Sequence, residues 1–293
     1  MAKVKTFVLA TLLISWSFIG LFALLGGEWS GLSSVVFGVI YMFIPAGVAM
    51  FLERRAGGSL KALAGFPVKL SRWYLVAWLL PIAVALASIG VALLLPGVRW
   101  DPEMSGMFTR FADSMSPEEL AAMQQQLDAL PIHPLFIGLG QALVAAVTVN
   151  AIAAWGEEVG WRGYMLRALA PLGFWRSSLL IGVIWGVWHA PIIVMGHNYP
   201  EHPFIGVGMM IVFCVLMSPL IQHVTQRAGS VLVAAVFHGA INASAGLAIM
   251  VVSGGSDLIV GVTGAAGFIV LGSANALLWV ATSRRASSSL PRV

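Results

Sequence analysis

The sequence predicts an all-α, polytopic membrane protein with about eight transmembrane helices. Of its 293 residues, 59% are hydrophobic and only 10% are charged, whereas a soluble domain carries about a quarter charged residues. The apolar residues form long continuous runs, each long enough to cross a hydrocarbon layer about 30 Å thick. A membrane β-barrel would instead show short segments that alternate polar and apolar residues. We therefore expect a single membrane domain over residues 1–293, without a second soluble domain.

Eight apolar runs, separated by clusters of Gly, Pro and charged residues, predict the transmembrane helices. They lie near residues 6–25, 33–52, 73–95, 134–155, 177–195, 205–223, 229–250 and 258–282. The first run could instead be the core of a signal peptide, with Lys3 and Lys5 as its charged start. It is longer than a usual signal core, however, and no cleavage site of the A-x-A type follows it, so we expect a retained helix.

The distribution of charge predicts the orientation. If both ends of the chain are cytoplasmic, the alternating loops place all of the 16 Lys and Arg except Arg99 and Arg110 on the inner side. Cytoplasmic loops are enriched in Lys and Arg. We therefore expect an integral protein of a bacterial-type plasma membrane, with both termini cytoplasmic and a short cytosolic tail, residues 283–293. The basic residues are dispersed at span ends, so the net charge of +4 indicates topology in a lipid bilayer and no nucleic-acid partner.

One sizeable insertion, about residues 97–131, lies between the third and fourth runs on the outer side. Within it, Ser116 is a suitable N-cap, Pro117 fits the first helical position and Glu119 completes a capping box. These signals predict a helix from Pro117 to about Ala129. Its apolar residues gather near one face, so we expect the helix to rest on the outer membrane surface.

Polar residues inside the apolar runs need a reason, because an ionisable group at membrane depth costs roughly 2.5 to 3.5 kcal/mol on insertion scales. They gather in three runs: Glu157, Glu158 and Arg162 in the fourth, His189 in the fifth, and His238 and Asn242 in the seventh. Residues four apart project from one face of a helix. This spacing relates His238 to Asn242, and it predicts an ion pair between Glu158 and Arg162. Glu157 points about 100° away and is the freer carboxylate.

These side chains suit hydrolysis. A carboxylate beside an imidazole can deprotonate water, and a histidine and an asparagine amide can donate to a developing oxyanion. Glu157, His189 and His238 could instead bind Zn²⁺, with water at an open position. Either arrangement activates water inside a membrane, so hydrolysis of a peptide or other acyl bond is the natural reaction. A non-catalytic transporter or scaffold with a polar binding site is the alternative.

The order of the motifs resembles a known family. EExxxR, then an aromatic-xxxH element, then HxxxN is the pattern of the CPBP family of CAAX proteases and bacteriocin-processing enzymes, also called Abi proteins or type II CAAX prenyl endopeptidases. Within a core of about residues 130–250, the elements run from Glu157 to Arg162, from Trp185 to His189 and from His238 to Asn242. The family usually has phenylalanine where this chain has Trp185.

The resemblance implies an eight-helix intramembrane endopeptidase whose site opens toward the cytosol. It implies that Glu157 is the general base that activates water, with His189 assisting. His238 and Asn242 would stabilise the tetrahedral oxyanion, and the ion pair of the first motif would shape the site. The family is commonly labelled a metalloprotease, and a metal-free glutamate mechanism has also been argued for it, so zinc stays an open alternative. The substrate would be a peptide or a membrane-associated protein.

Overall fold

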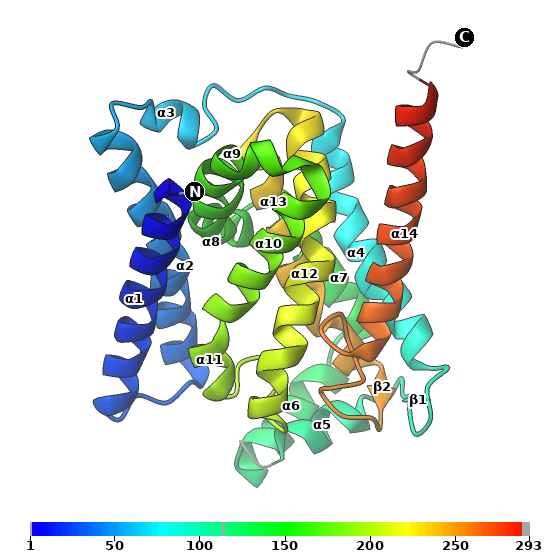
Figure 1. Cartoon of the computed structure of the whole chain (residues 1–293). Coiled ribbons are helices and arrows are strands. Elements are labelled where there is room, and N and C mark those ends of the chain that lie inside the picture. The colour runs from blue at the N-terminus through cyan, green and yellow to red at the C-terminus, as the bar shows by residue number, and fades with distance from the viewer. Residues whose placement is uncertain (1, 113–114, 289–293) are drawn as a thin grey trace.

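The computed structural model describes residues 2–112 and 115–288. These residues are mainly helical, with one short pair of strands. The long helices run side by side between two ends of the molecule (Figure 1). They are α1 Ala2–Leu24, α2 Gly31–Arg55, α4 Trp73–Ala92, α10 Gly173–Trp188, α12 Pro203–Ala228, α13 Val231–Ser244 and α14 Ala265–Ser288. The shorter elements are α3 Leu60–Leu63, β1 Arg99–Trp100, α5 Ser105–Phe111, α6 Pro117–Asp128, α7 Pro134–Ala145, α8 Val149–Glu158, η1 Val159–Met165, α9 Leu166–Leu169, η2 Ala170–Leu172, α11 Ala190–Val194, η3 Ala245–Met250 and β2 Val252–Ser253.

Seven helical stretches of the described residues are long and apolar enough to cross a membrane. This confirms the all-α, polytopic prediction. One stretch, Val149–Trp188, spans 40 residues and turns back at Gly173, whose φ of 74° favours glycine. It therefore contains two passes, with α8 running toward the turn and α10 away from it. The number of stretches is one below the eight predicted runs because this stretch combines parts of the fourth and fifth runs. α7, at 12 residues, is too short to cross alone.

The predicted continuous helix over residues 134–155 is wrong. α7 ends at Ala145 and α8 begins at Val149, and the Thr148 hydroxyl donates to the Val144 carbonyl at 2.8 Å. The break lets α13 approach closely, because a Cβ on Gly239 would lie only 2.9 Å from the carbonyl oxygen of Ala146. The hydropathy of residues 134–155 does not predict the break, because it contains no information about a contact with a distant helix.

Glycines bring the helices of the predicted site together. A Cβ on Gly156 would lie 2.7 Å from the backbone of α2, and one on Gly239 would lie 2.7 Å from the backbone of α8. A Cβ on Gly186 would lie 2.5 Å from the backbone of α12. Small residues allow this close backbone approach between membrane helices. Each of these glycines lies within three residues of a predicted site residue, so the same contacts set the positions of the polar side chains.

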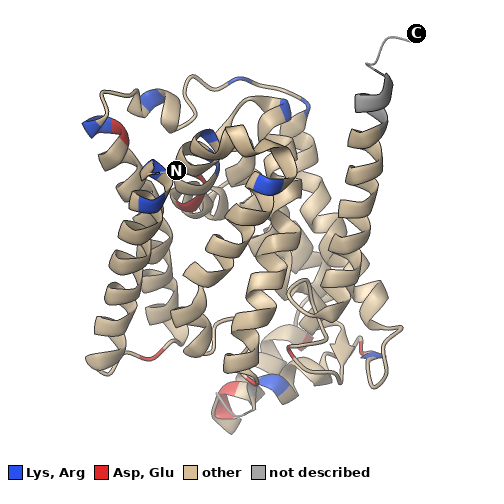
Figure 2. Cartoon of the chain, viewed as in Figure 1, with Lys and Arg blue, Asp and Glu red and all other residues tan. Residues whose placement is uncertain are grey.

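The two ends of the bundle differ in charge (Figure 2). The start of α1, the connection 56–72 and the turn 163–172 lie at one end with most of the Lys and Arg, and we call it the basic end. The insertion, the connections 25–30 and 195–202, and the segment 251–264 lie at the other, which we call the acidic end. These acidic-end segments contact one another, as Arg110 of α5 donates to Gly254 and pairs with Glu201 at 3.1 Å.

The insertion at the acidic end forms the predicted helix. α6 spans Pro117–Asp128, and its capping box is confirmed: Ser116 Oγ accepts the Glu119 N–H at 3.2 Å, and the Glu119 carboxylate accepts the Ser116 N–H at 2.8 Å. Nearby, β1 pairs antiparallel with β2, with Arg99 opposite Ser253. This pairing ties the insertion to the segment that precedes α14.

Candidate active site

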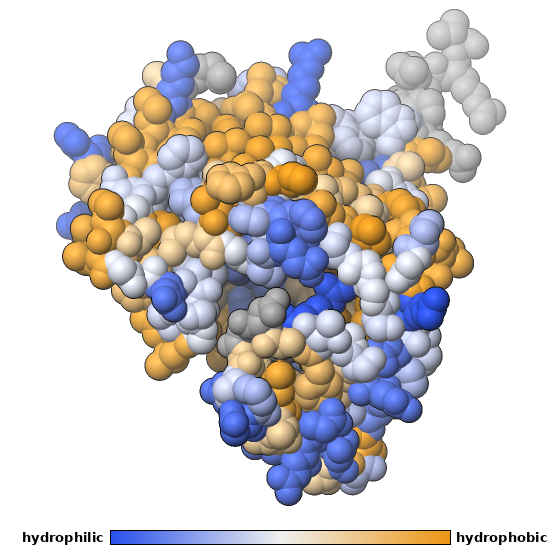
Figure 3. Space-filling model, turned by 90° about the horizontal axis from the view of Figure 1, so that it is seen from below, coloured by the Kyte–Doolittle hydropathy of each residue, from blue (hydrophilic) through white to orange (hydrophobic). Residues whose placement is uncertain are grey.

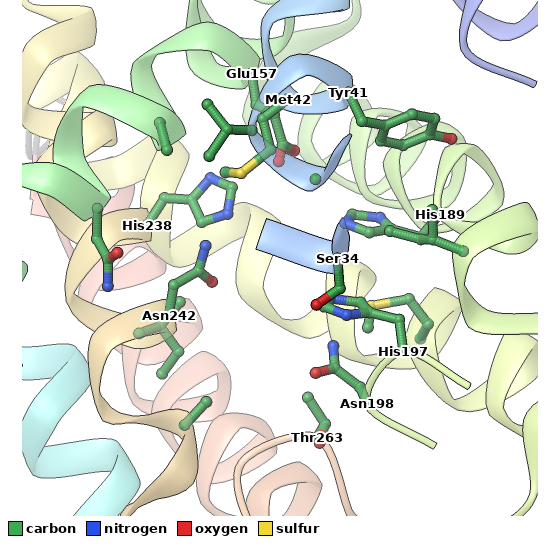
Figure 4. Close-up of a pocket in the computed structure, with 18 of the residues that line it drawn as sticks. Ser34, Tyr41, Met42, Glu157, His189, His197, Asn198, His238, Asn242 and Thr263 are labelled. Carbon is green, nitrogen blue, oxygen red and sulfur yellow. The ribbon is translucent and has the colours of Figure 1, made fainter. Parts of the chain in front are cut away.

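A cavity of about 460 Å³ lies among α2, α8, α10 and α13 (Figure 4). It brings together four of the six predicted site residues: Glu157, His189, His238 and Asn242. The other two, Glu158 and Arg162, are buried and do not line it. Side chains from three separate segments therefore meet around one space, as the three motifs predict.

Glu157 reaches this cavity from α8 and is held by two tryptophans. Its Oε2 accepts the indole N–H of Trp185 at 2.6 Å and that of Trp161 at 3.3 Å. The residue is only 2% exposed. Directly after the two glutamates, the chain forms the π-helical segment η1, a distortion that is frequent at functional sites. The carboxylate is thus fixed by its neighbours at the closed end of the cavity.

Glu158 organises a second, fully buried network. Its Oε1 lies 3.0 Å from Arg162 Nη1, and both side chains are 0% exposed, which confirms the predicted ion pair. The same oxygen lies 2.9 Å from Nδ1 of His238. Arg162 also donates to Ser218 at 3.2 Å and lies over the ring of Trp185. With Nδ1 of His238 directed to the carboxylate, Nε2 is the nitrogen left for the cavity.

His189 lies where α10 breaks. The helix ends at Trp188 because Pro191 has no backbone N–H, so the predicted run over 177–195 is divided there into α10 and α11. Nδ1 of His189 lies 2.8 Å from the carbonyl oxygen four residues earlier, which leaves Nε2 unoccupied. The break also frees the Trp188 carbonyl, which accepts the Tyr41 hydroxyl at 2.6 Å.

The cavity contains polar residues that the sequence analysis did not select. Asn150 lies seven residues before Glu157 on α8, and this spacing places both near one face. That signal was present in the sequence. Tyr41 of α2 and the loop residues had no such signal, because no motif relates their segments to the three that carry the site. The additional polar lining residues are Ser34, Tyr41, Asn150, His197, Asn198 and Thr263.

The mouth of the cavity lies at the acidic end. Trp29 and Thr263, from two connections at that end, line it, and Figure 3 shows the hollowed surface seen from there. The Trp29 indole donates to His197 Nδ1 at 3.2 Å, and the Tyr199 hydroxyl donates to the Thr263 carbonyl at 2.7 Å. Burial lowers the pKa of His197 to about 4, so its ring is neutral and accepts this bond.

The position of the mouth is compatible with only one of two expectations drawn from the sequence. α1 begins at the basic end, and α14 runs back to that end (Figure 1), while the cavity opens at the opposite one. A site open to the cytosol and cytoplasmic termini are therefore incompatible in this fold. One of the two expectations must be wrong.

The predicted zinc ligands do not fit one ion. A zinc ion bonds nitrogen and oxygen ligands at about 2 Å, so its ligand atoms lie close together. Among the described residues, only one group brings three ligand atoms within 4.8 Å of one another: Glu201, His202 and Asp257. Glu157, His189 and His238 do not form such a group. In the acidic-end group, the Asp257 carboxylate already accepts two backbone N–H groups and contacts His202 Nδ1 at 2.6 Å.

Comparison with known proteins finds a family similar to part of the chain. Residues 139–244 match the family described as type II CAAX prenyl endopeptidase, Rce1-like. Over these residues the chain is similar to that family. The matched segment lies within the expected core of about residues 130–250 and contains all six predicted site residues.

A curated CAAX protease is also similar to part of this chain. CAAX prenyl protease 2 of Methanococcus maripaludis is 31% identical over 97 residues, which cover 31% of this chain and 36% of the relative. The match thus spans about a third of that relative's length. The matched segment runs from α7 to α13, so α2 and the segment before α14, which supply Tyr41 and Thr263 to the cavity, lie outside it.

Proposed function

We propose that this chain is an intramembrane endopeptidase that hydrolyses a peptide bond in a peptide or a membrane-associated protein. Similarity of residues 139–244 to the CAAX protease family supports a peptidase over the transporter or scaffold alternative. The observation that carries the proposal for this chain is the single cavity shared by Glu157, His189, His238 and Asn242. It offers a base and hydrogen-bond donors on the walls of one space.

Glu157 is the general base in this proposal. Two indole N–H groups occupy its Oε2, which leaves Oε1 to accept a proton from water. The water oxygen then forms a bond to the carbonyl carbon of the substrate, and the carbonyl becomes a tetrahedral oxyanion. Transfer of the proton to the leaving nitrogen lets the C–N bond break, giving a carboxylic acid and an amine. General-base catalysis of this kind contributes roughly 10²- to 10⁴-fold.

His238 and Asn242 are placed to stabilise the oxyanion. His238 donates its Nδ1–H to the Glu158 carboxylate, and in its imidazolium form a second proton, on Nε2, points to the cavity. Asn242 lies one turn further along α13 and is exposed in the same space. Fixed donors aimed at a developing negative charge are commonly the largest source of rate enhancement. His189, on the facing wall in Figure 4, assists by orienting water through its Nε2.

The mechanism that we propose uses Glu157 directly, without zinc. The reason is the donor geometry, because Glu157, His189 and His238 do not bring three ligand atoms within 4.8 Å of one another. Glu157 is also engaged by two tryptophans rather than directed at the histidines.

The test uses the purified full chain and a fluorogenic peptide library. Glu157→Gln and His238→Ala should each lower the cleavage rate at least 100-fold, in line with loss of a general base or an oxyanion donor. Glu118→Gln on the exposed α6 is the matched control and should retain activity. Cleavage that survives both site substitutions would overturn the assignment of this cavity as the active site.

A second measurement addresses zinc separately. We expect chelator-treated protein, shown by elemental analysis to lack metal, to keep its full rate. Loss of activity on chelation and its recovery with Zn²⁺ would overturn the metal-free mechanism while leaving the peptidase assignment intact.

A further inference from the structure

We infer that the cavity receives its substrate from the extracytoplasmic side of the membrane, and that the substrate is an uncharged, partly apolar peptide segment exposed on that side. The inference rests on the proposed peptidase function. It replaces the cytosolic opening that the family resemblance implied, and it follows from three properties of the fold.

First, the residues that line the cavity extend to the acidic end. The lining continues from Glu157 and His238, past Ser34 near the start of α2, to Asn198 and Thr263 in the acidic-end connections. Figure 4 shows these labelled side chains around one continuous space. A substrate that enters between these connections reaches the proposed base without crossing a layer of packed side chains.

Second, the basic end of the same region is packed shut. The connection 56–72 covers it, with Leu63 only 1% exposed and the Ala64 carbonyl accepting the Trp155 indole N–H at 3.0 Å. A Cβ on Gly163 would lie 3.1 Å from the Leu63 carbonyl oxygen, so η1 packs directly against α3. Trp161 is fully buried beneath this contact. Among the described residues, none from the connection 56–72 or the turn 163–172 lines the cavity.

Third, the charge asymmetry places the basic end in the cytoplasm. Near the mouth, the described Lys and Arg are only Arg99 and Arg110, whereas the basic end carries Lys3, Lys5, Arg54, Arg55, Lys61, Lys69, Arg72, Arg167, Arg176 and Arg227 (Figure 2). An excess of Lys and Arg in short loops sets orientation in membranes. The cavity mouth, at the opposite end, then faces away from the cytoplasm.

The lining indicates what kind of segment fits. Among the residues that the structure describes, no Lys or Arg lines the cavity, and the polar groups there are hydroxyl, amide, indole and imidazole side chains beside the carboxylate of Glu157. The apolar part of the wall includes Val39, Phe213 and Ile241. The Arg162 side chain is paired with Glu158 and is 0% exposed, so the described part of the cavity wall offers no Lys or Arg to bind a free C-terminal carboxylate. An internal, uncharged stretch of a secreted or membrane-anchored chain matches this surface.

Cysteine labelling at the two ends of α2 tests the inference. Cys214 is the only cysteine and is fully buried, so Cys214→Ala gives a background in which Ser34→Cys marks the mouth and Ala56→Cys the basic end. In intact bacterial cells, a membrane-impermeant maleimide should label Ser34→Cys, and it should label Ala56→Cys only after permeabilisation. Labelling of Ala56→Cys in intact cells, or of Ser34→Cys only after permeabilisation, would overturn the inference.

A measurement of peptide cleavage tests the inference independently. In intact cells, the impermeant maleimide should lower the rate at which the Ser34→Cys variant cleaves an externally added fluorogenic peptide at least tenfold. It should leave the rate of the Ala56→Cys variant unchanged. Cleavage in detergent but none of external peptide in cells would overturn the direction of access and keep the peptidase. The expected labelling pattern without cleavage of any peptide under either condition would instead count against the proposed function alone.

Discussion

The indole N–H of Trp185 donates a 2.6 Å hydrogen bond to Oε2 of Glu157. Trp185 opens the second motif, where the resembling family usually has phenylalanine, which has no N–H to donate. In this chain the first and second motifs are therefore joined by a hydrogen bond to the proposed base, which both orients the carboxylate and contributes to its stability as an anion.

We expect Trp185→Phe to lower kcat about tenfold with little change in KM. A hydrogen bond to a charged group is worth roughly 1.5 to 3 kcal/mol, and about 1.4 kcal/mol corresponds to a factor of ten in rate. Trp161→Phe removes the longer 3.3 Å bond and should have the smaller effect. Steady-state kinetics of both variants make the comparison, and a larger loss in Trp161→Phe would contradict the relationship.

Removal of one partner of the buried ion pair should destabilise the protein strongly. Arg162→Met leaves Glu158 buried without its 3.0 Å partner, and such a loss costs roughly 3 to 5 kcal/mol. The double variant with Glu158→Gln should recover part of this loss, because no unpaired charge then remains. Thermal unfolding in detergent measures the stability of the single and the double variant. Arg167→Met is the control, since its pair with Glu53 is partly exposed and should contribute less than about 1 kcal/mol.

Gly239→Ala should impair catalysis through helix spacing. The new Cβ would lie 2.7 Å from the backbone nitrogen of Ala151 and would force α13 away from α8, moving His238 relative to Glu157. Overpacking of this kind costs roughly 1 to 3 kcal/mol. Gly90→Ala, where no atom lies within 4 Å of the added Cβ, is the matched control. Equal activity of the two variants would show that the close approach is not needed.

Acid should loosen the mouth of the cavity through His197. Burial lowers its pKa in the folded protein to about 4, against 6.5 for the free side chain, so the unfolded chain binds the proton first as pH falls. The contribution of neutral His197 is complete above pH 6.5 and is lost progressively toward pH 4. Melting temperatures measured across this range should fall less steeply in His197→Gln. Parallel curves for the two proteins would refute this role.

Local patterns in the sequence predict much of the fold. Continuous apolar runs require helices because a membrane interior offers no water to satisfy backbone groups, and the described helices cover all eight runs. The capping box at Ser116 is likewise local and appears as predicted. The break between α7 and α8 is different, because it accompanies a contact with Gly239, and a hydropathy pattern contains no information about such a partner.

The same division holds within the site. Glu158 and Arg162 are four residues apart in the sequence, and this spacing alone predicts their ion pair. Asn150 is seven residues from Glu157, and this spacing predicts that both lie on one face of the helix. The cavity is also lined by Tyr41, His197 and Thr263, and no sequence motif predicts this. They reach it only because α2 and two connections at the acidic end pack against the helices that carry the motifs.

By itself, the sequence determined that the chain crosses a membrane repeatedly, which loops carry the basic charge, and which ionisable groups are too costly to lie in lipid without a purpose. Those properties depend on the transfer free energy of each segment and on helical spacing. Tertiary structure alone decided which residues outside the motifs line the cavity, how the histidine rings are turned and at which end the cavity opens. These depend on close contacts between distant helices, where glycines let one backbone approach another.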